Sequence, residues 1–118
     1  PGMNFVDCTL EGNVAQFDGA SIPLDEAIAS KARSAQQKLE LGIRPMYLEV
    51  HPQAVDGSVP AEVKTVEDQG SYKIVTVTLA GKILRARVPE AQQVPEGRAW
   101  LVFPPQWTRL FAGGRLVR

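Results

Sequence analysis

The second half of the chain, from Asp56 onward, is divided into short segments of alternating or β-branched residues that are separated by glycine or proline. In the first of these segments one side of a candidate strand is formed by Val59, Ala61, Val63 and Thr65. Alternation with a period of two is typical of a strand with one buried face, and the Asp-Gln-Gly-Ser stretch at 68–71 predicts a turn after it. This half of the chain therefore predicts antiparallel β-structure.

The segments that follow keep the same organisation. Neither face of residues 72–79 is strongly polar, so we expect both faces of this strand to be covered, as in a barrel or at a contact with another chain. In the next strand Ile83, Arg85 and Arg87 lie opposite Leu84, Ala86 and Val88. The remaining predictions are a turn at 80–81, a polar loop at 89–97, a strand at 98–103 and a C-terminal hairpin that turns at Gly113 and Gly114.

The first half predicts paired strands at 5–10 and 13–17, with a turn at 11–12 and a short continuation at 19–23. Residues 25–37 are rich in Ala, Glu, Lys and Gln, with acidic residues first and basic residues later, which favours one helix of about three turns. Residues 38–45 return to a strand. The whole pattern predicts a mainly β fold: an OB-like β-barrel of short antiparallel strands with one short helix, forming a single domain over residues 1–118.

Composition narrows the possible partners. The chain has 118 residues, 13 basic and 13 acidic, so no overall field would attract it to nucleic acid or to an anionic membrane. Its single cysteine, Cys8, excludes an internal disulfide and favours a reducing, intracellular setting. No apolar run approaches the roughly 20 residues of a membrane span. Because the sequence starts with Pro1, we expect it to be a fragment of a longer protein.

Few residues suggest chemistry. The phosphate-binding pattern G-x-x-x-x-G-K-[ST] does not occur in the sequence. His51, the only histidine, precedes a proline at a strand end, where an exposed or capping role is expected rather than general-base catalysis. Cys8 alternates with Val6 and Leu10, which favours burial as a small hydrophobic residue. The acidic pairs at 25–26 and 67–68 fit a helix start and a turn. We predict no catalytic residue.

Two further features have structural interpretations. Trp100 and Trp107 could offer a stacking platform for bases, but core or interface packing is favoured because the sequence shows no basic groove beyond Arg85, Arg87 and Arg98. In the segment LGIRPMYL at 41–48, we expect Gly42 to permit a tight backbone, Arg44 to donate to oxygens at a strand end, and Pro45 to end the strand. This segment predicts a structural corner.

Several segments, taken in order, resemble one family. PGMNFV at 1–6, LGIRPMYL at 41–48, AEVKTVEDQGSYKIVTV at 61–77 and VPEGRAWLVFPPQWTRLFAGGRLV at 94–117 are similar to the C-terminal regulatory region of ATP-binding subunits of ABC importers, the maltose and glycerol-phosphate type above all. The resemblance covers nearly the whole chain. Met46 stands where that family usually has glutamate, Ala112 and Gly113 replace an acidic turn residue, and the helical segment is longer than expected.

The resemblance implies a transport-associated OB-like barrel, similar to molybdate-binding barrels, that follows an ATPase domain lying outside this chain. ATP and Mg²⁺ would bind in that domain, and this chain would hold no cofactor or metal. Expected partners are a second copy or a related ATPase subunit, the transmembrane permease subunits through the parent chain, and a regulatory protein, but no nucleic acid. The parent complex would lie in the cytoplasm, against the inner face of the membrane. Candidate structural or interface residues are Gly42, Arg44, Pro45, Gly70, Trp100, Trp107 and Phe111.

Three functions remain open at this point. The first is a noncatalytic regulatory and dimerisation domain of an importer ATPase for carbohydrates, polyols or glycerol phosphate. The second is a barrel that binds a small oxyanion such as molybdate, which needs backbone N–H groups and Ser, Lys or Arg side chains that converge at one place. The third is a module for single-stranded nucleic acid, which the neutral net charge disfavours.

Overall fold

The computed structural model of the chain describes residues 2–17 and 20–118. Within these ranges it contains strands, one α-helix and one short 3-10 helix, in the order β1 (Asn4–Glu11), β2 (Val14–Phe17), β3 (Ala20–Pro23), α1 (Glu26–Ala35), β4 (Leu39–Ile43), β5 (Glu49–His51), β6 (Val59–Asp68), β7 (Tyr72–Leu79), β8 (Lys82–Pro89), β9 (Arg98–Val102), η1 (Pro105–Trp107), β10 (Arg109–Ala112) and β11 (Arg115–Leu116). The fold is mainly β and OB-like with one short helix, which confirms the predicted fold class.

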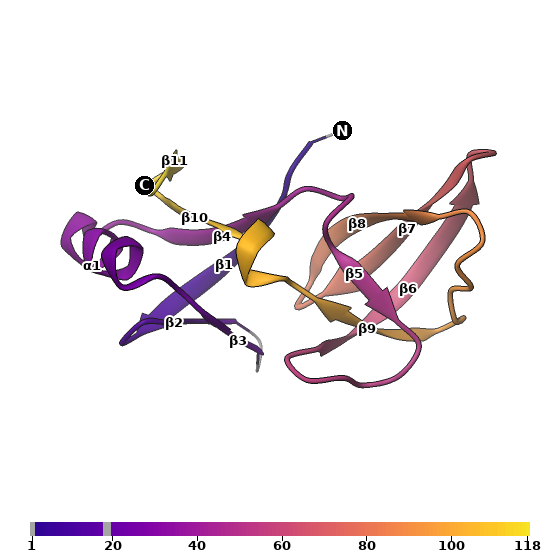
Figure 1. Cartoon of the computed structure of the whole chain (residues 1–118), viewed down its shortest axis with the longest axis horizontal. Helices are drawn as coiled ribbons and strands as arrows, with labels where there is room; N and C mark the ends of the chain where they lie inside the picture. The colour runs from indigo at the N-terminus through magenta and orange to yellow at the C-terminus, as the bar shows by residue number, and fades with distance from the viewer. Residues whose placement is uncertain (1, 18–19) are drawn as a thin grey trace.

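The strands form two antiparallel sheets that lie side by side along the long axis of the molecule (Figure 1). The first sheet has the order β11-β10-β4-β1-β2-β3 and the second has the order β5-β9-β6-β7-β8. The chain leaves the first sheet after β4, builds the second, and returns through η1 to pair β10 with β4. The molecule is accordingly elongated, with extents of 44 × 26 × 23 Å.

The alternation in the sequence explains the second sheet. Leu84, Ala86 and Val88 of β8 are buried, and Ala86 pairs with the buried Val75 of β7, while the side chains between them on β8 are exposed. The expectation that both faces of β7 are covered is met only in part, because the second face, which includes Tyr72, is half-buried. This sheet therefore has one core face and one face that remains partly open to solvent.

The helix begins and ends at side-chain and backbone caps. The Asp25 carboxylate accepts a hydrogen bond from the backbone N–H of Ala27 at 2.8 Å, and Gln36 ends the helix with a left-handed φ of 51°. The predicted helix over 25–37 is confirmed at Glu26–Ala35, with Asp25 and Gln36 as its caps and Gln37 beyond it. Ala29 and Ala32 are the buried residues of the helix.

The predicted hairpins are present. At the β6–β7 turn Gly70 has a φ of 97°, and its N–H donates to the Asp68 carboxylate at 2.8 Å. Glycine adopts this backbone region without strain, which gives this candidate residue a local structural reason. The predicted continuation at 19–23 corresponds to β3, which pairs with β2, although its first residue, Gly19, lies outside the described residues.

Buried apolar side chains from both sheets form one hydrophobic cluster. The rings of Phe17 from β2 and Phe103 after β9 meet edge to face across the two sheets, with their centroids 5.0 Å apart. This continuity agrees with the single domain that the sequence predicts over 1–118, which stays a prediction. Among the described residues there is no helix both long and apolar enough to cross a membrane.

Candidate functional site

The segment LGIRPMYL forms the corner where the chain leaves the first sheet. The backbone N–H of Tyr47 donates to the carbonyl of Arg44 at 3.0 Å, which closes a β-turn with Pro45 at its second position, where proline is favoured. The Arg44 side chain is exposed, and within the described residues its guanidinium makes no hydrogen bond or ion pair. The turn closes through backbone atoms, and the expectation that this guanidinium donates to oxygens at a strand end stays a prediction.

Backbone and aromatic contacts hold the corner instead. The backbone N–H of Arg87 on β8 donates to the carbonyl of Pro45 at 2.8 Å. The Tyr47 ring stacks on the Trp107 ring of η1, with centroids 4.2 Å apart and an angle of 6° between the planes. Because Tyr47 lies on the outgoing connection and Trp107 on the returning one, this stack joins both crossings between the sheets.

Gly42 on β4 lies beneath three larger side chains. A Cβ at this position would lie 2.6 Å from Sδ of Met3 and 2.7 Å from Cε1 of Phe111. The Phe111 ring in turn meets the Phe5 ring edge to face, with centroids 5.2 Å apart. The reason for glycine here is thus close side-chain packing over a strand, rather than the tight backbone expected from the sequence.

Asn4 at the start of β1 connects the first sheet to the second. Its side-chain amide donates to the carbonyl of Arg85 at 2.7 Å, and its side-chain oxygen accepts from the N–H of Arg85 at 2.8 Å. The Asn4 amide thereby satisfies the same two backbone groups that a neighbouring strand would satisfy at this unpaired edge of β8. Asn4 is 9% exposed, so these bonds are partly shielded from water.

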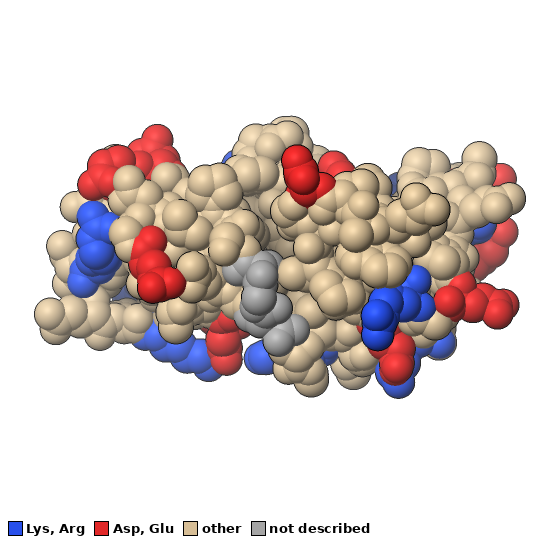
Figure 2. Space-filling view, turned by 90° about the horizontal axis from the view of Figure 1, so that it is seen from below, with Lys and Arg blue, Asp and Glu red and all other residues tan. Residues whose placement is uncertain are grey.

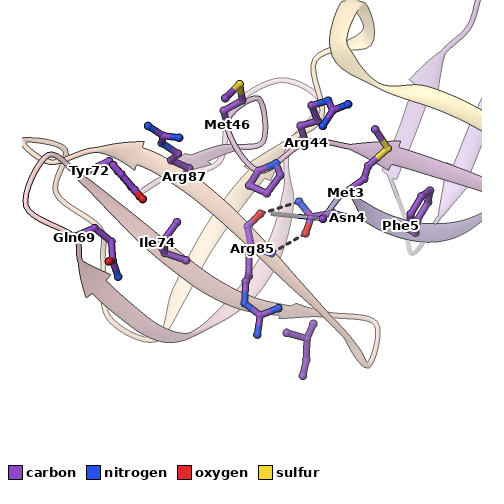
Figure 3. A pocket seen from close by; sticks show the side chains of 13 residues that line it. Met3, Asn4, Phe5, Arg44, Met46, Gln69, Tyr72, Ile74, Arg85 and Arg87 are labelled. Atoms are coloured by element: carbon purple, nitrogen blue, oxygen red, sulfur yellow. Dashed lines mark hydrogen bonds between the residues drawn. The ribbon is translucent and has the colours of Figure 1, made fainter.

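A groove of about 560 Å³ lies where the corner, the N-terminal segment and β7–β8 meet (Figure 3). Its side chains include three arginines and several apolar groups, and none of the described residues that line it carries a carboxylate. The guanidinium carbon of Arg87 lies 3.9 Å from the centroid of the Tyr72 ring, a cation–π contact. The lining comprises Gly2, Met3, Asn4, Phe5, Arg44, Pro45, Met46, Gln69, Tyr72, Ile74, Ile83, Arg85 and Arg87.

Cys8 and His51 come first among the residues whose side chains could take part in chemistry. Burial raises the pKa of the Cys8 thiol to about 11, helped by the nearby Asp7 and Glu40 carboxylates, so the thiol is a poor nucleophile at neutral pH. His51 is partly exposed and lies 2.9 Å from the Glu49 carboxylate. Within the described ranges, no three His, Cys, Asp or Glu side chains are grouped so that they could hold a metal ion.

The two tryptophans lie on different parts of the fold. Trp100 is half-buried on β9, opposite His51 of β5 and Pro60 of β6, whereas Trp107 lies in η1 with 42% of its surface exposed. Tyr47 already covers one face of the Trp107 ring. On the molecular face drawn in Figure 2, acidic and basic side chains are interspersed and form no extended basic field. Neither observation favours base stacking.

Comparison with known proteins gives two family matches, one for each part of the chain. A family model described as "MalK OB fold domain" matches residues 1–45, which hold β1 to β4, and a model described as "TOBE domain" matches residues 41–111. The chain belongs to the TOBE domain family. No curated protein matches it. Domains of these two kinds are typical of the C-termini of ABC transporter ATPases. The matches therefore agree with the resemblance to ABC ATPases in general that the sequence shows.

A solved structure has the same overall fold. It is that of the cytoplasmic molybdate-binding protein ModG with molybdate bound, and it aligns with a TM-score of 0.59 and 14% sequence identity. The alignment covers 93% of this TOBE domain and 84% of that chain. At this low identity the likeness shows a shared fold.

The two family matches overlap at residues 41–45, so the boundary between them falls on β4 and the corner. The fold brings Gly42, Arg44, Pro45 and Phe111 into this part of the TOBE domain, whereas Gly70 and Trp100 lie elsewhere in the second sheet. Sequence reasoning missed Asn4 and Tyr72. It did place Arg85 and Arg87 on the open face of β8, and that alternation was the signal that could have identified the groove.

Proposed function

We propose that the chain is the noncatalytic C-terminal regulatory and dimerisation domain of the ATP-binding subunit of an ABC importer for carbohydrates, polyols or glycerol phosphate. The observation that carries the proposal is the succession of two family matches, a MalK-type OB domain at 1–45 and a TOBE domain at 41–111, on one continuous fold. The motif order in the sequence supports the same importer type. ATP and Mg²⁺ would bind to the ATPase domain of the parent chain, and the permease subunits would contact that chain at the inner face of the membrane.

In this role the domain holds two ATPase subunits together while their nucleotide-binding halves separate. A tether of this kind keeps the effective concentration of the halves high after each opening. A regulatory protein that binds the domain in one arrangement of the pair would shift the population toward that arrangement.

Two measurements test the proposal. The reading frame upstream of Pro1 is expected to encode G-x-x-x-x-G-K-[ST], and a frame without this motif would overturn the ATPase assignment. Analytical ultracentrifugation of the chain over a range of concentrations is expected to show a reversible monomer–dimer equilibrium. A strictly monomeric chain at all concentrations would remove the dimerisation role.

A second candidate function is binding of a small oxyanion. It is favoured by the fold shared with molybdate-bound ModG. Against it, the backbone N–H groups of Arg85 and Arg87 beside the groove already donate to Asn4 and Pro45. Calorimetry with molybdate, tungstate and sulfate separates the two functions, since saturable heat with micromolar affinity would establish the sensor and flat traces would exclude it.

A further inference from the structure

Positive charge is concentrated in the groove between the corner and β7–β8, although the chain as a whole has no net charge. Arg44, Arg85 and Arg87 line it, and no carboxylate does so among the residues that the structure describes, while the whole sequence balances 13 basic against 13 acidic residues. Within the described residues, none of the three guanidinium groups forms an ion pair. The groove therefore has a local charge that nothing in the described structure neutralises.

The same groove exposes large apolar side chains. Phe5, Met46 and Ile83 are 39%, 53% and 62% exposed, and all three line it. Exposed hydrophobic groups gathered at one place mark binding surfaces, whereas isolated ones do not. A ligand that fits must therefore offer apolar groups together with negative charge.

The arrangement of the cations favours an extended ligand over a small one. Figure 3 shows that the guanidinium groups do not point to a common centre: the Arg85 side chain extends away from those of Arg44 and Arg87. A single small anion needs donors that converge, whereas separated cations suit several carboxylates spaced along a chain. Apolar side chains between those carboxylates would meet Met46 and Ile83.

We propose that this groove is the docking surface for an extended acidic peptide segment of a partner protein, in which carboxylate and apolar side chains alternate. A segment of this composition offers carboxylates to the separated arginines of the groove and apolar groups to its exposed apolar side chains, and an extended backbone spaces them along its length. Only the biological source of the segment rests on the proposed regulatory function. The binding itself rests on the residues of this chain.

The test uses the chain and a short fluorescein-labelled peptide of alternating glutamate and leucine, followed by fluorescence anisotropy. Saturable binding is expected, and its affinity should fall about tenfold between about 50 mM and about 500 mM salt because rim charges are screened. A peptide with glutamine for glutamate, and another with glycine for leucine, should each bind about tenfold more weakly. Equal binding of the glutamate and glutamine peptides overturns the proposal.

Matched variants locate the site. Arg85→Glu with Arg87→Glu should weaken binding of the glutamate–leucine peptide at least about tenfold. Arg98→Glu with Arg115→Glu, which makes the same charge change at exposed positions outside the groove, should leave affinity within about twofold. If the first pair of substitutions impairs folding, judged by circular dichroism, the exposed Met46→Ala and Ile83→Ala variants replace it and should also weaken binding.

Other outcomes decide against the peptide. Equal loss in both pairs of charge-reversal variants indicates a nonspecific field and overturns the site. Tighter binding of sulfate, of a single-stranded oligonucleotide or of vesicles containing phosphatidylserine, with displacement of the peptide, assigns the groove to that ligand instead. Absence of peptide binding by a chain that still dimerises overturns the groove assignment alone and leaves the proposed function standing.

Discussion

The side-chain amide of Asn4 and the backbone of Arg85 form a two-way hydrogen-bonded pair that joins the two sheets. Removing it with Asn4→Ala leaves the N–H and carbonyl of Arg85 without these partners in a partly buried place. We expect the free energy of unfolding to fall by about 1–3 kcal/mol. Urea unfolding measures the change, and Gln69→Ala, which removes an exposed amide from the same groove, should leave the midpoint unchanged. Equal midpoints for Asn4→Ala and the unsubstituted chain would refute the link.

Substitution of Gly42 should also lower the stability of the chain. An added methyl group in Gly42→Ala would press on Met3 and on the Phe111 ring, so we expect a loss of about 1–3 kcal/mol in the free energy of unfolding. Gly2→Ala is the control because a Cβ there meets nothing within 4 Å. A Gly42→Ala chain as stable as the control would show that these two side chains move aside without cost.

The stack of Tyr47 on Trp107 gives a prediction about coupling. A double-mutant cycle of Tyr47→Ala and Trp107→Ala should yield an interaction energy of about 0.5–1.5 kcal/mol, because each ring covers a face of the other. Tyr47→Phe keeps the ring and should retain most of the stability. Additive effects in the cycle would mean that the two crossings are held independently.

The substitution Arg44→Ala distinguishes the interpretation from the sequence from the one that the structure supports. The sequence predicts that Arg44→Ala lowers the melting temperature or loosens a dimer, whereas the exposed guanidinium leads us to expect a change in stability within about 0.5 kcal/mol. Differential scanning calorimetry decides this, and an effect as large as that of Asn4→Ala would restore the original interpretation. The part of that prediction that concerns the dimer stays a prediction.

The raised pKa of the Cys8 thiol predicts slow alkylation of the native chain. Burial, followed by the Asp7 and Glu40 carboxylates, raises its pKa from 9.0 to about 11, so below pH 9 the native chain holds about one hundredth of the thiolate of an unfolded chain. Alkylation by iodoacetamide at pH 8 should therefore be about a hundredfold slower in the native chain than in urea. Comparable rates would show an accessible, ordinary thiol.

The same shift has a consequence for stability. Since the native pKa is raised, the native state keeps a proton that the unfolded state loses between pH 9 and pH 11. Stability from this thiol is thus fully present below pH 9 and is lost as the pH rises toward 11. Cys8→Ser should flatten this part of the stability profile, and an unchanged slope would assign it to other groups.

Local patterns in the sequence determined the strands, the hairpins and the helix of this protein. Alternation along β8, the capping Asp25 and the turn glycine Gly70 act over a few residues, so their physical effect is visible without the fold. The fold class follows from them. The exposed face of β8, with Arg85 and Arg87, was evident in the same way.

Only the tertiary structure decided which of these elements meet. Asn4 and Arg85 lie 81 residues apart in the chain, and no local pattern relates an amide at the start of one strand to the edge of a strand in another sheet. The sequence therefore predicted a corner at Arg44 but assigned its stability to the guanidinium, whereas the return of the chain through η1 brought Trp107 onto Tyr47. Long-range packing of two sheets, rather than the chemistry of any one residue, created the groove.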